Sequence, residues 1–310
     1  MFIVMPRQGH APVNRQTSNA VISSRRKTID GAHVTSLMFR QATSLQSLLR
    51  STWVHRGLIV QLARKDVIGR YKGSLLGLAW SFLSPLFVLG IYTLFFTEVF
   101  HVHWATMDGD GKGQYATALF AGLIIYTVFA DCITRGSQLV TGNANYVTKV
   151  IFPLEILPWV SSLTAIYYAL ASLAVLAAFS LIFTRHIAST FLLFPVIFVP
   201  LMLLSTAAGW LLASLGVYAR DVSQMTTLIT IALLYTSPVF FPLDHASAGM
   251  RSVMRLNPLT FLIEQARRVL LWNQLPDGLG LSVYTAGCLL SCWLAYVWFQ
   301  RTRGGFIDVL

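Results

Sequence analysis

The sequence predicts an all-α, polytopic membrane protein with six transmembrane helices, and three observations support this fold class. The chain of 310 residues is 55% hydrophobic and only 11% charged, with a mean hydropathy of +0.63, which is too apolar for a soluble domain of this length. Six apolar runs are long enough to cross a hydrocarbon core of about 30 Å. The basic residues gather outside those runs. The net charge of +11 therefore indicates contact with a membrane and not with nucleic acid.

Residues 1–47 are expected to form a disordered cytoplasmic tail. Up to residue 36 the tail is rich in Ser, Thr, Asn, Gln and basic residues, and it has no helical periodicity. The apolar run before Pro6 is too short for a secretory signal peptide. Met38 is an alternative start, because every recognisable segment follows it.

Residues 49–72 predict an amphipathic helix that lies on the inner membrane surface. Apolar residues recur on one face at helical spacing, and basic residues on the other face meet lipid headgroups. Each such basic group contributes about 1 kcal/mol near an anionic leaflet. An ordinary basic flank of the first span is the alternative. The interfacial residues are Arg64, Lys65, Asp66, Arg70, Tyr71 and Lys72.

The six predicted spans share an apolar length of about 20 residues and follow in the order 78–100, 115–134, 158–183, 190–218, 222–242 and 281–299. The last four contain no Asp, Glu, Lys, Arg or His. In the second span Asp131 and Arg135 stand at i and i+4, so we expect them to pair. Cys132, Cys288 and Cys292 lie inside spans without a metal-binding spacing, and we interpret them as small buried hydrophobic residues.

Two connections have patterns of their own. Between spans two and three, a capping Asn143 or Asn145 and the stop at Phe152 and Pro153 predict a short cytoplasmic helix, assigned to 143–155, that can serve as a lever for a soluble partner. Between spans five and six, the polar interruptions indicate re-entrant or interfacial helices within 250–271.

The positions of Lys and Arg predict the topology. Of the 23 basic residues, 17 fall before the first span, in the second-to-third and fourth-to-fifth connections, and after the last span. The positive-inside bias therefore places both termini in the cytoplasm.

Five motifs in order carry a resemblance to a known family: RKDVIGRYKGSLLGLAWSFLSPL before and into the first span, NANYVTKVIFPLEILP at 143–158, YARD at 218–221, SPVFFP at 237–242 and NPLTFLIEQARRVLL at 257–271. Together they resemble the ABC-2 type permeases, and more narrowly those that export O-antigen, capsule or teichoic-acid polysaccharides. The resemblance covers roughly residues 50–305.

The resemblance implies a multi-pass subunit of the bacterial inner membrane that pairs with a second copy of itself and with two cytoplasmic ABC ATPase subunits. Those partners would bind ATP and Mg, and this chain would hold no cofactor or metal. The expected cargo is lipid-linked polysaccharide, most simply O-antigen. The implied ATPase-coupling residues are Asn143, Asn145, Tyr146, Lys149, Phe152, Pro153 and Glu155. The implied outer gate comprises Arg251, Arg255, Asn257, Pro258, Glu264, Arg267 and Arg268, where Glu264 can pair with Arg267 or Arg268.

The chemistry of the residues agrees with a transport subunit whose energy comes from a partner protein. The sequence has no nucleotide-binding P-loop, since its only Gly-Lys pair, Gly111 and Lys112, is followed by glycine. Ionisable residues at membrane depth are limited to Glu98, Asp131 and Arg135, which is sparse for a proton-driven carrier. We therefore expect no enzymatic activity from this chain.

Aromatic residues in two spans are candidates for a sugar-binding channel wall, because flat rings suit the C–H-rich faces of sugars. They are Tyr92, Phe95, Phe96, Tyr235, Phe240 and Phe241. Ordinary packing or an interfacial belt is the alternative for each of them.

Other functions stay open at this stage. A membrane glycosyltransferase is suggested by His101, His103, Asp108 and Asp110 in the first outer loop, although Leu119 stands where a calcium loop would need Glu. A non-transporting scaffold is a third class, and a related permease for a small hydrophobic compound is a fourth. The sequence does not identify the glycan or its lipid carrier, or whether the ATPase recognises the glycan.

Overall fold

The computed structural model describes residues 44–95, 112–147, 152–183, 188–243 and 246–309, and this part of the chain consists of helices and their connections. The predictions for residues 1–43, for Phe96, Glu98 and the first outer loop, and for Lys149 concern residues outside the described part. The α-helices are α2 (Leu45–Val54), α3 (Arg56–Arg70), α4 (Trp80–Leu94), α5 (Lys112–Gly136), α6 (Ala144–Val147), α7 (Leu157–Phe183), α8 (Phe194–Tyr218), α9 (Val222–Tyr235), α10 (Ala248–Leu256), α11 (Leu259–Leu270), α12 (Gly278–Thr302) and α13 (Phe306–Val309). The short 3₁₀ helices are η1 (Gly77–Ala79), η3 (Thr141–Asn143), η4 (Leu154–Ile156), η5 (Ser189–Leu193) and η7 (Arg303–Gly305).

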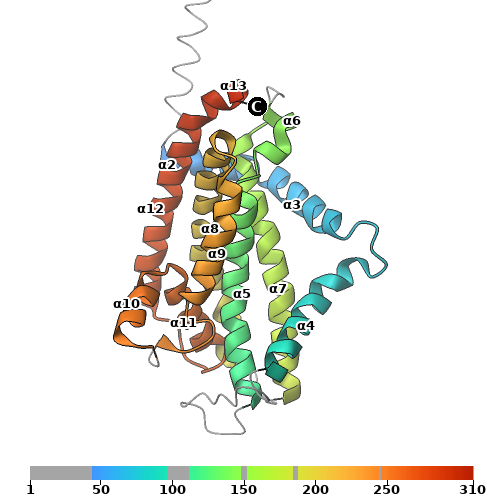
Figure 1. The fold of residues 1–310 in the computed structure, drawn as a ribbon, viewed down its shortest axis with the longest axis vertical. Coiled ribbons are helices and arrows are strands. Elements are labelled where there is room, and N and C mark those ends of the chain that lie inside the picture. The colour runs from blue at the N-terminus through green and yellow to red at the C-terminus, as the bar shows by residue number, and fades with distance from the viewer. Residues whose placement is uncertain (1–43, 96–111, 148–151, 184–187, 244–245, 310) are drawn as a thin grey trace, which may run out of the picture.

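The long helices run side by side and define two ends of the bundle (Figure 1). One end holds α2, α6 and α13, and we call it the C-terminal end. The other holds α10 and α11, which form a hairpin, and we call it the hairpin end. The predicted orientation would place the C-terminal end in the cytoplasm.

Helix α5 is the centre of the fold. Most of its span is buried, and it packs against α4, α7, α8, α9 and α11. Its side chains dominate a large apolar core that also includes residues of α7, α8 and α11. A second core surrounds Trp210 near the C-terminal end, where the Trp210 ring meets those of Trp159 and Tyr296. Because both cores include residues of α8, the apolar packing continues from one end of the bundle to the other.

Helix α8 makes its closest approaches through glycine. A Cβ on Gly216 would lie 2.0 Å from the carbonyl oxygen of Ser137, just after α5, and a Cβ on Gly209 would lie 3.0 Å from Pro158 of α7. Small residues let helix backbones approach closely where the surrounding lipid gives no hydrophobic drive. A buried hydrogen bond of 2.9 Å between the hydroxyls of Ser162 and Thr206 also joins α7 to α8.

Five helical stretches in the described part are long and apolar enough to span a membrane: Gly77–Leu94, Tyr115–Gly136, Leu154–Ile182, Ser189–Tyr218 and Gly278–Gly305. They correspond to five of the six predicted spans. The fold is therefore all-α and polytopic, as the sequence predicts.

The predicted span at 222–242 is wrong in length. Helix α9 has only 14 residues, and turns follow it from Thr236. Pro238 and Pro242 explain the early end, because proline lacks an amide hydrogen and disfavours helix in the residue before it.

The single interfacial helix predicted at 49–72 is two helices. They separate at His55, whose ring nitrogen lies 2.9 Å from the carbonyl oxygen of Ser51 and whose backbone leaves the helical region. Helix α2 begins at Leu45, so the expected tail of 1–47 overlaps a helix by three residues. After α3, the chain reverses at Gly73 and Gly77, which both have positive φ.

Candidate functional site

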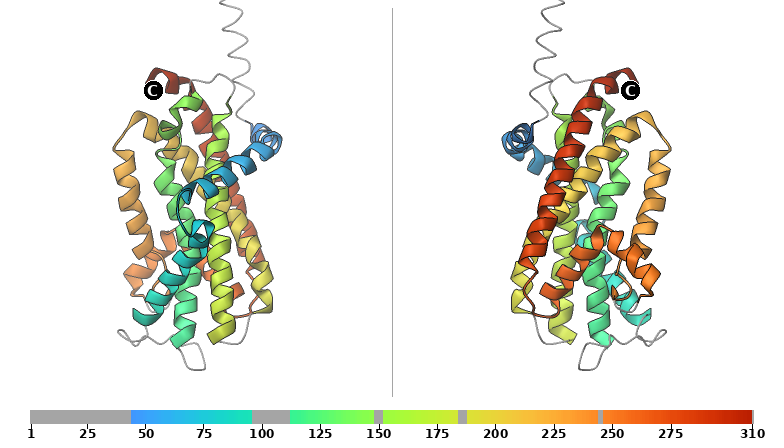
Figure 2. Two further views of the ribbon diagram at one scale, coloured as in Figure 1. Left: turned by 90° about the vertical axis from the view of Figure 1, so that its right-hand side faces the viewer. Right: turned by 90° about the vertical axis from the view of Figure 1, so that its left-hand side faces the viewer.

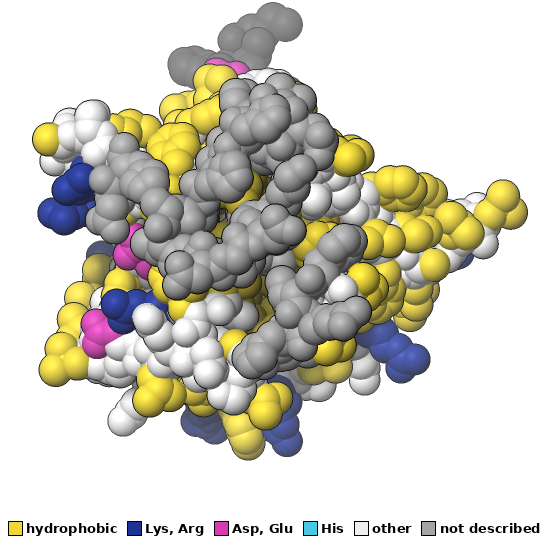
Figure 3. Space-filling model, turned by 90° about the horizontal axis from the view of Figure 1, so that it is seen from below, with side chains coloured by type: hydrophobic (Ala, Val, Ile, Leu, Met, Phe, Trp, Pro, Cys, Tyr) yellow, Lys and Arg dark blue, Asp and Glu magenta, His cyan; other side chains and the backbone are white. Residues whose placement is uncertain are grey.

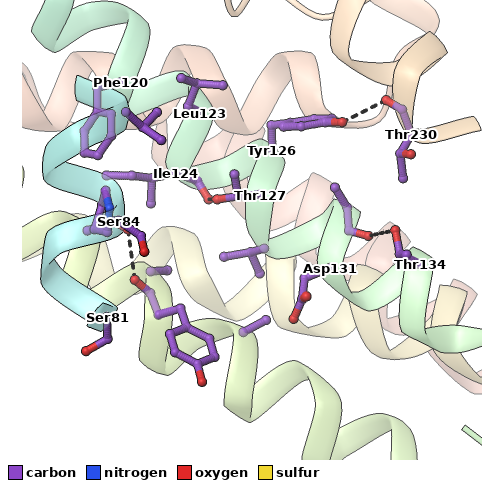
Figure 4. A pocket seen from close by; sticks show the side chains of 18 of the residues that line it. Ser81, Ser84, Phe120, Leu123, Ile124, Tyr126, Thr127, Asp131, Thr134 and Thr230 are labelled. Atoms are coloured by element: carbon purple, nitrogen blue, oxygen red, sulfur yellow. Dashed lines mark hydrogen bonds between the residues drawn. The ribbon is translucent and has the colours of Figure 1, made fainter. Parts of the chain in front are cut away.

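A cavity of about 670 Å³ opens on one side of the bundle at the height of the spans. Its walls come from the end of α3 and from α4, α5, α7 and α9. Figure 4 shows that side chains of α5 form much of the wall, with Ser81 and Ser84 facing them from α4. Because α4 and α9 lie on the same side of the bundle (Figure 2), the opening lies between two helices that are themselves largely exposed.

The lining of this cavity combines aromatic rings with hydroxyl groups. The aromatic residues are Tyr71, Trp80, Tyr92, Phe120, Tyr126 and Tyr168. The further hydroxyl-bearing residues are Ser81, Ser84, Thr127, Thr134, Ser172 and Thr230. Such a wall offers apolar faces and hydrogen-bonding groups without a fixed charge over most of its area, which suits a neutral, hydroxyl-rich molecule.

Several serine and threonine hydroxyls in the cavity donate to backbone carbonyls of their own helix. Thr127 donates to Ile124, Thr134 to Ala130 and Ser172 to Tyr168. Tyr126 instead reaches across to α9 and donates to the carbonyl of Thr230 at 3.0 Å (Figure 4). A hydroxyl that donates in this way still has lone pairs to accept a hydrogen bond. The wall can therefore accept from a ligand without losing its internal bonds.

An ion-pair network closes the end of the cavity next to α3. Asp131 of α5 accepts a hydrogen bond from the Arg135 guanidinium at 3.2 Å, which confirms the predicted i, i+4 pair. Arg70 contacts Asp131 at 3.3 Å and Arg135 contacts Asp66 at 2.6 Å, so α3 is fastened to α5 from both sides. The Arg70 guanidinium also lies 4.4 Å from the centre of the Tyr168 ring.

The predicted interfacial residues thus divide into two groups. Asp66 and Arg70 are engaged with α5, and Tyr71 lines the cavity and packs edge-on against Tyr168. Arg64, Lys65 and Lys72 are exposed, where headgroups can reach them. The expectation that Arg70 meets only headgroups needs correction, because Asp131 provides a nearer and partly buried partner.

The predicted channel aromatics are also divided. Tyr92 lines the cavity, and its ring centre lies 6.4 Å from that of Phe240, which is 5.9 Å from that of Tyr235. Phe95 and Phe241 are exposed and are absent from the cavity wall, and Phe96 lies outside the described residues. The aromatic cluster therefore extends the cavity wall from α4 toward the segment after α9.

At the C-terminal end, Glu155 joins three elements that are distant in sequence. Its carboxylate accepts from Ser51 of α2 at 3.2 Å and from Arg303 of η7 at 2.9 Å, and its carbonyl accepts from the Trp210 indole at 3.0 Å. The side chain is only 13% exposed. Glu155 therefore holds elements of this chain together and presents little surface to a partner.

The continuous coupling helix predicted at 143–155 is not observed. Helix α6 is described only up to Val147, Phe152 and Pro153 are not helical, and Glu155 belongs to η4, which leads directly into α7. Pro153 at the start of η4 explains the separation. Asn143 donates to the carbonyl of Leu139, Asn145 is exposed, and the ring of Tyr146 stacks on that of Phe152 at 4.2 Å.

At the hairpin end, α10 and α11 separate at Asn257 and Pro258, as the sequence predicts. Asn257 is buried, and its amide donates to the Leu233 carbonyl and to Thr236, which fastens the hairpin to the end of α9. Arg251 and Arg255 lie on α10, while Glu264, Arg267 and Arg268 lie on α11.

Arg267 has a role that local spacing does not reveal. The sequence predicts that Glu264 pairs with Arg267 or Arg268. The structure shows in addition that the Arg267 guanidinium points into the core and donates to the carbonyls of Ala118 at 3.0 Å and Val239 at 2.8 Å. Gly122 of α5 leaves room for it, since a Cβ there would lie 3.3 Å from the guanidinium. The side chain thereby ties α11 to α5 and to the segment after α9.

Sequence reasoning missed most of the cavity wall, including Trp80, Tyr126 and Tyr168. One signal was present for Tyr126 and Asp131, which stand five residues apart on a span that otherwise carries few polar groups. Trp80 and Tyr168 had no comparable signal, because their helices are apolar on every face. Arg303 was also missed as a partner of Glu155.

Comparison with known proteins identifies the family of this chain. A model of the family described as "ABC-2 type transporter" matches residues 57–271. The chain is 26% identical to the O-antigen export system permease protein RfbA of Myxococcus xanthus, over 84% of this chain and 98% of that protein. Two proteins of the same name from Klebsiella pneumoniae are 22% and 23% identical, each over 82% of this chain and 95% of their own length. These matches favour a transport subunit over the membrane glycosyltransferase considered above. The chain belongs to the ABC-2 type transporter family.

Proposed function

We propose that this protein is the transmembrane subunit of an ATP-driven exporter that moves lipid-linked O-antigen polysaccharide across the bacterial inner membrane. The observation that carries the proposal is the match to O-antigen export permeases over almost their whole length. The cavity between α4, α5, α7 and α9 supports it, because aromatic faces and hydroxyl acceptors suit a neutral sugar chain that must bind weakly and keep moving.

A second copy of the chain would complete the path. Helices α4 and α9 flank the cavity, and both expose large apolar side chains, including Phe87 and Ile91 on α4 and Leu228 on α9. A face of this kind suits either lipid or a partner helix. Two copies that meet through these helices would bring two cavities together into one enclosed channel with an aromatic wall.

Energy would come from two cytoplasmic ATPase subunits that bind ATP and Mg and dock at the C-terminal end. The accessible groups there are Asn145 and the Tyr146–Phe152 stack. Glu155 and Arg303 lie behind them and connect this surface to α2 and α12. In this arrangement Glu155 transmits movement of the docking surface and does not contact the ATPase itself.

The decisive experiment is export in cells that lack the gene. Loss of the chain should abolish surface O-antigen and leave the lipid-linked polymer on the inner leaflet, as measured by lipopolysaccharide gels and by surface labelling. A copy of the chain should restore export only with an ATPase partner that hydrolyses ATP. Normal surface O-antigen in the deletion strain would refute the cargo, and full export with a hydrolysis-defective partner would refute the energy source.

Cavity variants test whether the described wall is the path. Tyr168→Phe and Trp80→Ala should slow export while the protein reaches the membrane in normal amounts, because each removes a group that faces the cavity. The matched control is Trp298→Ala, an exposed aromatic of α12 outside the wall. An equal loss in the control would show that the cavity is not the path.

A further inference from the structure

A groove of about 540 Å³ lies between α3 and α6, on the side of α3 that is nearer to the C-terminal end (Figure 1). Helix α3 contributes Leu62, Lys65 and Asp66 to its wall, and α6 contributes Tyr146. Residues from the end of α5 and the start of α7 complete the wall. This hollow, which we call the α3–α6 groove, shares no residue with the cavity between α4 and α9.

The groove carries one positive charge that its ion pairs do not neutralise. Arg135 of the wall pairs with Asp66 and with Asp131. Arg70 in turn pairs with Asp131, so two arginines and two aspartates balance one another. Lys65 is exposed on the wall and forms no ion pair with any residue that the structure describes. A ligand of the groove should therefore bring a negative charge to Lys65.

Uncharged hydrogen-bond donors also line the groove. The side-chain amide of Gln138 and the hydroxyl of Tyr146 make no hydrogen bond with other described residues. Ser161 is 4% exposed, and apart from a weak interaction with the Cys132 thiol, its hydroxyl has no partner in the described part of the chain. A buried hydroxyl that lacks a hydrogen bond costs about 1–3 kcal/mol. These groups favour a ligand with several acceptor oxygens, such as a carboxylate.

The position of the groove favours a protein partner. Tyr146 belongs both to the groove and to the stack with Phe152 that is accessible at the C-terminal end. The exposed charged residues of α3 are all basic: Arg56, Arg64, Lys65 and Arg70. Seen from the hairpin end, by contrast, basic and acidic side chains lie close together on the side that holds α10 (Figure 3). A basic helix beside the docking surface is complementary to an acidic surface on the partner.

We propose that the α3–α6 groove receives a carboxylate side chain, from an Asp or Glu on the surface of the ATPase partner. The carboxylate pairs with the ammonium group of Lys65 and accepts hydrogen bonds from the uncharged donors of the groove. Asp66 does not exclude it, because Arg135 lies 2.6 Å from the Asp66 carboxylate and neutralises its charge. The inference rests on the proposed function, since it requires an ATPase that docks at the C-terminal end.

Binding of the ATPase that restores export to the full-length chain in lipid nanodiscs tests the groove. Nanodiscs of phosphatidylcholine alone carry no net charge, so anionic lipid does not contribute. Lys65→Gln should raise the Kd about threefold, and Lys65→Glu should raise it about tenfold or more, because reversal adds repulsion. The matched control is Arg64→Glu, the same reversal at an exposed position of α3 outside the groove wall, which should leave the Kd nearly unchanged.

A charge-swap scan then identifies the carboxylate. Each exposed Asp and Glu of the ATPase is changed to Lys, and one of these variants should restore tight binding to the Lys65→Glu chain. If no variant does so, or if Arg64→Glu weakens binding as much as Lys65→Glu, the inference is wrong. If Lys65→Glu does not reach the membrane, Lys65→Gln decides the question, and an unchanged Kd refutes the groove.

Two further outcomes separate the possible sources of failure. An effect of Lys65→Gln that is seen only in nanodiscs containing phosphatidylglycerol would show that the groove takes a lipid phosphate, and it would overturn the inference. Absence of binding between the wild-type chain and the ATPase would refute the energy source in the proposed function. Normal binding that ignores both Lys65 variants would overturn the groove alone.

Discussion

The two ends of the bundle each use one charged side chain to join several elements, and they differ in how deeply that side chain is buried. At the hairpin end, Arg267 is 1% exposed and donates to two backbone carbonyls. At the C-terminal end, Glu155 and its partner Arg303 have side chains that are 13% and 31% exposed. A buried guanidinium is costly to rearrange, whereas a partly hydrated ion pair can exchange its partner for water. We infer that the hairpin end is a fixed base and that the C-terminal end is adapted to move.

The largest expected effect on stability comes from replacing Arg267, the buried side chain that joins the elements of the hairpin end. Arg267→Met removes both donors and leaves the carbonyls of Ala118 and Val239 without them, so we expect destabilisation of about 3–5 kcal/mol. Arg267→Lys keeps the charge but not the fork that spans two acceptors, and it should lie between wild type and Arg267→Met. Thermal unfolding in detergent measures both. The matched control is Arg268→Met at the less buried neighbouring position, and equal melting temperatures for Arg267→Met and this control would contradict the comparison.

A second prediction tests how closely α8 packs against the end of α5, near the C-terminal end of the bundle. Gly216→Ala places a Cβ against the Ser137 carbonyl, and because backbone must shift, we expect a loss of about 1–3 kcal/mol. Gly287→Ala in α12 meets nothing within 4 Å and should be neutral or slightly stabilising. The difference in melting temperature between the two variants is the measurement. If they behave alike, the close approach of α8 to the end of α5 is wrong.

The third prediction concerns the ion pair between Glu155 and Arg303 at the C-terminal end. Glu155→Gln and Arg303→Gln should each cost about 1 kcal/mol, and the double variant should cost less than the sum, because both remove the same ion pair. The single variants should also lower the ATP turnover of the assembled exporter. Thermal unfolding gives the coupling energy, and ATPase assays with the partner give the functional effect. Additive losses together with unchanged turnover would show that the pair is incidental.

The smallest expected effect lies between the two ends, in the network that fastens α3 to α5. Arg135→Gln removes contacts to Asp66 and Asp131 and should cost about 0.5–1 kcal/mol at low salt. The loss should shrink in high salt, because these side chains are partly exposed and screened. Arg64→Gln, at an exposed position of α3, is the control and should show no change at either salt concentration. A salt-independent loss would indicate packing by Arg135 and not its charge.

The spans, the hairpin break and one ion pair could be predicted from local patterns. Apolar runs of sufficient length define most spans, Asn257 and Pro258 mark the break, and the i, i+4 spacing of Asp131 and Arg135 indicates their pairing. Each of these features depends on residues close together in the chain. This is why the structure shows these features almost as the sequence predicts them.

The cavity and the junctions could not be predicted in the same way. A helix that is apolar on every side gives no sign of which face lines a cavity, so Trp80 and Tyr168 were missed. Glu155 and Arg303 are 148 positions apart, and no local pattern brings them together. The local spacing of Glu264 with Arg267 and Arg268 gave no sign that carbonyls on α5 and after α9 accept from Arg267.

The short length of α9 changes the thickness of the barrier beside the cavity. Fourteen helical residues span about 21 Å, which is about 9 Å less than a typical hydrocarbon core. Because Asn257 fastens the hairpin to the end of α9, protein and not lipid fills the missing depth. Hydrophobic mismatch of this kind would normally thin the bilayer or tilt the helix. If the proposed path is right, a cargo that follows α9 would leave the apolar zone after about two thirds of the distance that the surrounding membrane would impose.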